Sequence, residues 1–136
     1  QLDLEGNYYP KGYLDFEKFS QSENFLSGVK KLEDSMKQNY TVVLMCAEKD
    51  PFTCHRTILV ARAFFKRGYK IIHLMPDGKN LTQEDIEKQL LDKYAKNRHQ
   101  MGLFNPIVIS EEEHINEAYR KHNEKIGYSI EKEEDE

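Results

Sequence analysis

The feature that most constrains the fold of this chain is a strand–helix–strand pattern between residues 41 and 75. Residues 41–47 are a continuous apolar run of strand-forming residues, which is typical of a strand covered on both faces. Residues 54–67 are apolar nearly all round, as in a mostly buried helix, and residues 70–75 are a second strand-like run. A crossover of this length predicts that the two strands are parallel and that their connection is right-handed.

Apolar residues at helical spacing predict helices that each begin after a residue favoured at the N-cap. The expected N-cap residues are Ser22, Thr53, Thr82 and Ser110. Residues 107–109 predict a third short strand. The whole pattern predicts an α/β fold: a small, mainly parallel sheet with helices on both faces, in a Rossmann-like three-layer arrangement. We expect a single domain over residues 1–130 and an acidic tail over residues 131–136.

Composition narrows the class of protein. The chain has 136 residues, enough for one domain with its own core. Its net charge is −4, from 20 basic and 24 acidic residues, which disfavours nucleic acid as a partner. No apolar run approaches the ~20 residues of a membrane span, so no membrane partner is expected. Two cysteines are too few for a disulfide framework, so we expect a cytoplasmic protein. No cofactor is predicted.

The stretch from Cys46 to Arg56 carries the functional signal. It begins where the first predicted strand ends and stops in the first turn of the predicted helix. Open α/β sheets bind ligands at this edge, and a helix start attracts anions through its unpaired N–H groups. Arg56 adds a bidentate donor for phosphate or carboxylate. These residues predict a site for a small phosphate-like anion.

We expect the residues of this stretch to divide into two sets. The expected substrate-binding residues are Arg56, Lys49 and Cys46, and the expected catalytic residues are Cys54, His55 and Glu48. Cys54 is the expected nucleophile, because a helix start beside two basic side chains stabilises a thiolate. Cys46, at the end of a strand buried on both faces, is expected to be less reactive. Glu48 and His55 are expected to orient groups or exchange protons.

Three other interpretations stay open. The loop can serve a non-catalytic module that binds a nucleotide, a nucleic acid or a protein. It can also be purely structural, with the charges of Glu48, Lys49 and Arg56 holding it in place. A zinc site made by both cysteines and His55, with Glu48 or His73, is disfavoured, since the spacing of the cysteines is unusual for zinc, and we predict no metal. His73 in the second strand is expected to be a hydrogen-bonded core residue.

The loop closely resembles the signature of the domain-of-unknown-function 488 family, a group of uncharacterised bacterial proteins. The residues that match its Cys-x-Glu-Lys…Pro…Cys-His-Arg pattern are Cys46, Glu48, Lys49, Pro51, Cys54, His55 and Arg56. Further similarity lies at residues 12–13, 73–74, 76–78 and 123–128.

The resemblance also has a consequence for assembly. The Gly-His-Ser strand and the Asp-Val-Arg segment that open the family's domain do not occur here, so the resemblance implies its carboxyl-terminal part, without the amino-terminal strands. An open sheet edge of that kind is usually covered by a partner, and we expect a homodimer.

Overall fold

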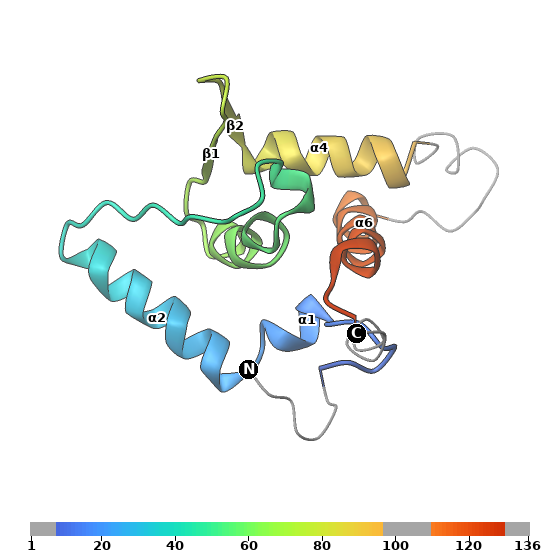
Figure 1. The fold of residues 1–136 in the computed structure, drawn as a ribbon, viewed down its shortest axis with the longest axis horizontal. Helices are drawn as coiled ribbons and strands as arrows, with labels where there is room; N and C mark the ends of the chain where they lie inside the picture. The colour runs from blue at the N-terminus through green and yellow to red at the C-terminus, as the bar shows by residue number, and fades with distance from the viewer. Residues whose placement is uncertain (1–7, 97–109, 130–136) are drawn as a thin grey trace.

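The computed structural model describes residues 8–96 and 110–129, which form a mixed arrangement of helices and a short hairpin (Figure 1). The elements in chain order are α1 (Phe16–Phe19), α2 (Glu23–Lys37), the 3₁₀ turn η1 (Pro51–Thr53), the π-helix η2 (Arg56–Ala61), α3 (Arg62–Lys66), β1 (Ile72–Leu74), β2 (Asn80–Thr82), α4 (Gln83–Tyr94) and α6 (Glu111–Ile126). Figure 1 shows α4 lying across one end of α6, with η2 and α3 beside them and α2 set apart at the edge.

The sheet differs from the expected one. Strands β1 and β2 pair antiparallel, with His73 opposite Leu81, and a tight turn joins them. The Met75 N–H donates to the Lys79 carbonyl at 3.0 Å, and Gly78 takes a positive φ of 82° in that turn. The prediction of a mainly parallel, Rossmann-like sheet is therefore wrong for the described residues. A hairpin brings two strands together through a short turn, whereas parallel strands need a long crossover. In this chain the hairpin supplies β2 as the partner of β1. The third strand predicted at 107–109 and the acidic tail at 131–136 lie outside the described residues.

The apolar run at 41–47 is an extended segment rather than a paired strand (Figure 1). Val43 is 66% exposed and Met45 is 92% exposed, so the expectation of a strand covered on both faces is wrong. Within the described residues, the backbone of 41–46 makes one hydrogen bond, which the Leu44 carbonyl accepts. A continuous apolar sequence shows that a strand can be buried, but burial requires neighbours on both sides, and the described chain does not supply them here.

Three of the expected helix starts are confirmed. The Ser22 side chain accepts a hydrogen bond from the Phe25 N–H at the start of α2. Both α4 and α6 begin with a capping box, in which Thr82 and Ser110 exchange hydrogen bonds with the third helical residue. These caps are local, because each partner lies three residues along the chain.

The helix expected from Cys54 begins later and differently. Asp50 caps the turn η1, its carboxylate accepting the Phe52 N–H at 2.9 Å, and the Thr53 hydroxyl donates back to the Asp50 carbonyl at 3.1 Å. The Thr53 hydroxyl therefore bonds within the turn that Pro51 starts, and Thr53 is not the N-cap of the helix. The helix opens at Arg56 as a π-helix, which continues as α3.

The core lies where η2, α4 and α6 meet, and α1 closes it from one side. Its largest members are fully buried apolar or aromatic side chains: Ile58, Ile86, Leu90 and Tyr119. Asn123 of α6 ties the amino-terminal segment to this core, since its amide donates to the Leu14 carbonyl and accepts from the Phe16 N–H. The Leu14 N–H also donates to the Tyr128 carbonyl at 2.8 Å. The loop with the sequence motif therefore sits beside a core built from distant parts of the chain.

Candidate functional site

Arg56 joins the two ends of the motif loop. Its Nη1 atom donates to the Leu44 carbonyl at 3.2 Å, which holds the helix start against the end of the extended segment. The guanidinium lies near the thiol of Cys46, and also near His73 of β1. A guanidinium carries five N–H donors, and this contact uses one of them. Arg56 is half-buried, so a ligand reaching this edge would meet its remaining donors.

The two cysteines of the loop have opposite environments. Cys46 is exposed and Cys54 is 0% exposed. The pKa of Cys46 is lowered, first by a hydrogen bond from the Cys54 thiol, then by the Glu48 backbone N–H, with a smaller contribution from Arg56. The pKa of Cys54 is raised, first by burial and then by its neighbour Cys46.

The directions of the two pKa shifts are opposite to those that a helix start beside basic side chains would give. The buried sulfur of Cys54 accepts the Arg56 N–H, so the helix start does act on it, but desolvation outweighs that bond. For Cys46, desolvation also raises the pKa, but the hydrogen bonds from the Cys54 thiol and the Glu48 N–H outweigh it. The exposed thiol of this site, and the one whose pKa is lowered, is therefore that of Cys46.

His55 packs against two aromatic side chains. Its ring stacks on Tyr128 with centroids 4.2 Å apart and planes 13° from parallel, and it contacts Phe16 at 5.1 Å. Burial lowers the pKa of His55, and the charge of Glu48 opposes that shift. The Nε2 atom is buried and has no hydrogen-bond partner among the described residues. This environment favours the neutral imidazole and a packing role between the motif and the two ends of the chain.

The side chains of Glu48 and Lys49 are exposed, and neither forms an ion pair within the described residues. Of the three charges expected to hold the loop in the structural interpretation, Arg56 alone does so, through the Leu44 carbonyl. Hydrogen bonds within the loop lie between Asp50 and Cys54, whereas residues 46–49 are exposed.

His122 of α6 supports the site from outside the motif. Its Nε2 lies in a short hydrogen bond with the Phe52 carbonyl in η1, and its Nδ1 accepts from the Tyr94 hydroxyl at 2.7 Å. Because a carbonyl only accepts, the Nε2 atom carries the hydrogen. Burial lowers the pKa of His122. Its place on the apolar face of the last predicted helix was the signal for a buried, bonded histidine.

The prediction that His73 is a hydrogen-bonded core residue is confirmed. Its Nε2 bonds to the Gln83 amide oxygen at 2.7 Å, and the Gln83 amide nitrogen donates to the Tyr119 hydroxyl at 2.9 Å. The Tyr119 hydroxyl in turn donates to Glu87 at 3.1 Å. Since an amide oxygen only accepts, His73 is protonated at Nε2, which leaves Nδ1 as a base. Burial lowers the pKa of His73, and the charge of Arg56 adds to this effect.

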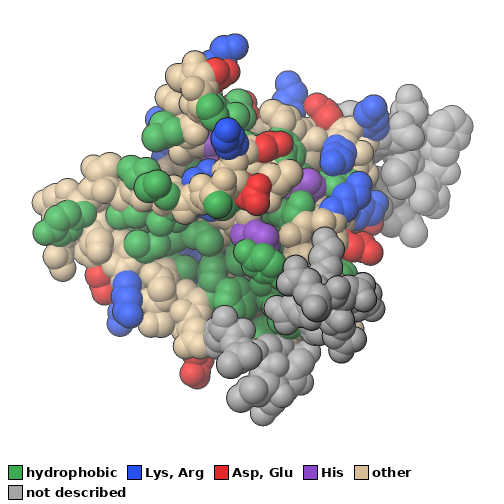
Figure 2. Space-filling view, viewed as in Figure 1, with side chains coloured by type: hydrophobic (Ala, Val, Ile, Leu, Met, Phe, Trp, Pro, Cys, Tyr) green, Lys and Arg blue, Asp and Glu red, His purple; other side chains and the backbone are tan. Residues whose placement is uncertain are grey.

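A cavity of about 450 Å³ opens beside Arg56. It lies between the extended segment and β1, and its lining joins apolar side chains from both to Arg56, Lys70 and His73. Figure 2 shows apolar side chains gathered over the extended segment on this side of the molecule. The described lining contains no carboxylate, so its charge is positive.

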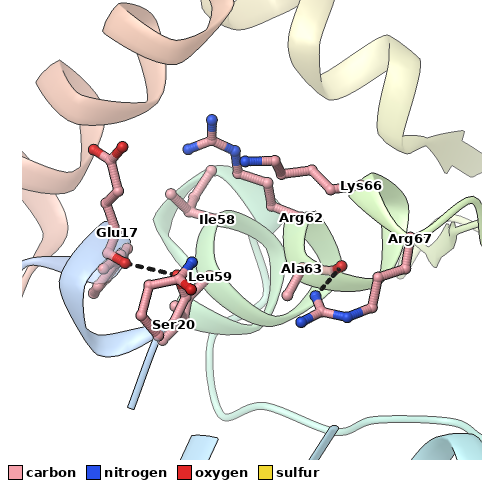
Figure 3. Close-up of a pocket in the computed structure, with 10 residues that line it drawn as sticks. Glu17, Ser20, Ile58, Leu59, Arg62, Ala63, Lys66 and Arg67 are labelled. Carbon is pink, nitrogen blue, oxygen red and sulfur yellow. Dashed lines mark hydrogen bonds between the residues drawn. The ribbon is translucent and has the colours of Figure 1, made fainter. Parts of the chain in front are cut away.

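A second cavity, of about 360 Å³, lies against η2 and α3 (Figure 3). Its lining includes Arg62, Lys66 and Arg67, and the two arginines already contact other residues of the protein. Arg62 stacks 3.9 Å from the Tyr119 ring centroid and donates to Asn116 at 2.6 Å, and Arg67 donates to the Ala63 carbonyl at 2.7 Å. These contacts are structural, and we assign no ligand to this cavity.

The described residues thus define a small helix-and-strand protein with a thiol pair beside an arginine. The model of the family described as "Domain of unknown function DUF488" matches residues 4–63, the N-terminal part of the chain, and this match supports the membership that the motif indicated. Neither a curated protein nor a solved structure gives a match. The described residues contain no helix long and apolar enough to cross a membrane, and no group of three metal-ligating side chains.

Proposed function

We propose that the loop from Cys46 to Arg56 binds a small phosphate-like anion and that Cys46, not Cys54, is its reactive thiol. The observation that carries the proposal is the position of Arg56, held on the Leu44 carbonyl and near the exposed sulfur of Cys46. A cation and a nucleophile at one edge are the pairing needed for thiolate attack on an anionic electrophile.

Each neighbouring group has a role in this proposal. The Cys54 thiol and the Glu48 N–H donate to the Cys46 sulfur, which stabilises the thiolate in the attacking position. The free donors of Arg56 bind the anion, and exposed Lys49 adds positive charge on the same loop. The Glu48 carboxylate, exposed two residues from Cys46, is the group that exchanges protons, while His55 positions the loop through its stack on Tyr128.

Alkylation with a matched pair of reagents tests this proposal. Iodoacetate is an anion and iodoacetamide is neutral, so Arg56 should favour iodoacetate at Cys46, and inorganic phosphate should protect against it. The Arg56→Ala variant should lose this preference and the protection. Arg67→Ala is the matched control, because Arg67 lies on α3 and bonds to Ala63. Equal rates for both reagents in the unaltered protein, or faster labelling of Cys54, would refute the proposal.

A second proposal concerns binding to another copy of the chain. The apolar edge, defined here as the exposed apolar side chains beside the cavity, consists of Val43, Leu44, Ile72 and Leu74 together with adjacent Met45. Among the residues that the structure describes, the extended backbone beside it has N–H and C=O groups without a hydrogen-bond partner, and such an edge pairs readily with another strand. Antiparallel pairing about a two-fold axis would satisfy both copies at once. We therefore propose that the protein is a homodimer.

We also propose that the protein is cytoplasmic, because both cysteines are free thiols and the cytoplasm keeps thiols reduced.

A further inference from the structure

The cavity beside Arg56 has room for more than a bare anion. Its volume is about 450 Å³, and most of its lining is apolar. Ala61 and Phe64, on the helix that follows the motif, are buried. Val42 on the extended segment and Ile71 just before β1 are half-buried. Pockets of roughly 300–1,000 Å³ with mainly apolar walls and a few polar groups are typical of sites for small organic ligands. The cavity therefore has the form of a site for a molecule with an apolar part.

The π-helix η2 places a cation and an apolar helix face in the same cavity. Arg56 and Ala61 are its first and last residues, five apart, and both line the cavity. In an α-helix of 3.6 residues per turn, residues five apart lie on different sides. The i→i+5 bonding of a π-helix brings them to one side, and π-turns occur frequently at functional sites. Phe64, three residues further on in α3, continues the same lining.

The polar groups of the lining favour a phosphate. Arg56 is fixed at the wall by its bond to the Leu44 carbonyl, and both residues line the cavity. Lys70 adds a second cation, and no carboxylate stands among the described lining residues. His73 also lines the cavity, and its Nδ1 atom has no hydrogen-bond partner in the described part of the chain. A positive lining of this kind attracts a group with more than one negative charge, and a phosphate monoester carries about −1.5 to −2 at pH 7.

We propose that this cavity binds a phosphate monoester with an aliphatic group, the phosphate at Arg56 and the aliphatic group against the apolar lining. This inference rests on the proposed function in placing the anion at Arg56, and it adds what the anion is attached to. The aliphatic group also covers part of the exposed rim, where Ile72 and Leu74 line the cavity. Each buried methylene contributes about 0.8 kcal/mol, which is about a four-fold gain in affinity, so the length of the aliphatic group should control binding.

Titration calorimetry on the full-length chain tests this inference with octyl phosphate, ethyl phosphate and inorganic phosphate, each below any micelle-forming concentration. Octyl phosphate should bind at least about ten-fold more tightly than ethyl phosphate. Leu74→Ala should weaken binding of octyl phosphate and leave that of ethyl phosphate unchanged. Leu26→Ala, at an exposed position of α2 outside the cavity, is the matched control and should change neither.

A second set of variants tests the charges. Arg56→Gln should weaken binding of both esters, and Arg67→Gln, in the second cavity, should leave both unchanged. Lys70→Gln repeats the test at an exposed position, where the fold is not at risk. Equal affinity for the two esters, or octanoate or octyltrimethylammonium binding as tightly as octyl phosphate, would overturn the inference. A loss of binding in Arg67→Gln would place the ligand in the second cavity and would also overturn it.

The anion site and the apolar part of the ligand can fail separately. If inorganic phosphate protects Cys46 from iodoacetate through Arg56 while octyl and ethyl phosphate bind alike, the anion site stands and this inference falls. If octyl phosphate binds through Arg56 without slowing the labelling of Cys46, the cavity ligand stands and the proposed role of the thiol falls.

Discussion

His122 of α6 holds the Phe52 carbonyl of the motif loop, across a separation of 70 residues in the chain. The same imidazole accepts the Tyr94 hydroxyl from α4. The turn that leads into the motif helix is thereby fastened to the two helices that form the core. The position of the candidate site depends on this bond, because residues 46–49 on the other side of the turn are exposed.

Removing this imidazole should destabilise the protein. His122→Ala removes the part-buried hydrogen bonds to the Phe52 carbonyl and the Tyr94 hydroxyl, and the net loss for a hydrogen bond is about 0.5–1.5 kcal/mol each. We expect a lower free energy of unfolding in urea. His114→Ala, on the same helix near its start, is the control and should change stability by less than about 0.5 kcal/mol. Equal losses in the two variants would show that the Phe52 bond contributes nothing.

Acidification should weaken the fold below neutrality. Burial lowers the pKa values of His55, His73 and His122 in the folded chain. An unfolded histidine titrates near ~6.5, so below that pH the unfolded chain binds more protons than the folded one and stability is lost. The contribution is fully present above ~6.5 and decreases as the pH falls through that value toward the folded pKa values. Urea midpoints measured between pH 7.5 and 5.5 should fall with pH, and His122→Gln should flatten the slope.

A matched pair of leucines tests where the core lies. Leu90 of α4 is 1% exposed, whereas Leu74 of β1 is 67% exposed. Leu90→Ala should cost about 2–5 kcal/mol, because it removes buried methyl groups and leaves a cavity. Leu74→Ala should cost less than about 0.5 kcal/mol in the monomer. Denaturant unfolding at low protein concentration measures both, and a larger loss for Leu74→Ala would place the core elsewhere.

The proposed dimer makes a separate prediction about Met45. Met45→Lys places a charge on the apolar edge at a fully exposed position, so it should leave the stability of the monomer unchanged. It should lower the average mass in light scattering from that of a dimer to that of a monomer, since edge charges block strand pairing. Leu26→Lys, at an exposed position of α2, is the control and should remain dimeric. A monomeric unaltered protein at high concentration would contradict the proposed dimer.

Much of the helical structure could be read from the sequence, because its causes are local. Ser22, Thr82 and Ser110 each bond to a backbone N–H three residues along, and the apolar spacing of the following helices needs only the helical period. The motif was equally visible, since it is a matter of residue identity. The same reasoning from local sequence gave a wrong N-cap at Thr53. Pro51, two residues earlier, starts a short turn that includes Thr53, so the helix begins later.

The sheet and the environments of the two cysteines depend on contacts between distant residues. Strand-forming sequence at 41–47 predicts that a strand can form, but pairing and burial depend on which neighbours are present, and β1 pairs with its local hairpin partner instead. For the same reason, a helix start made Cys54 look reactive, while packing put its thiol in the interior and left Cys46 in solvent. Desolvation is a property of the whole surrounding structure, and no spacing of residues along the chain encodes it.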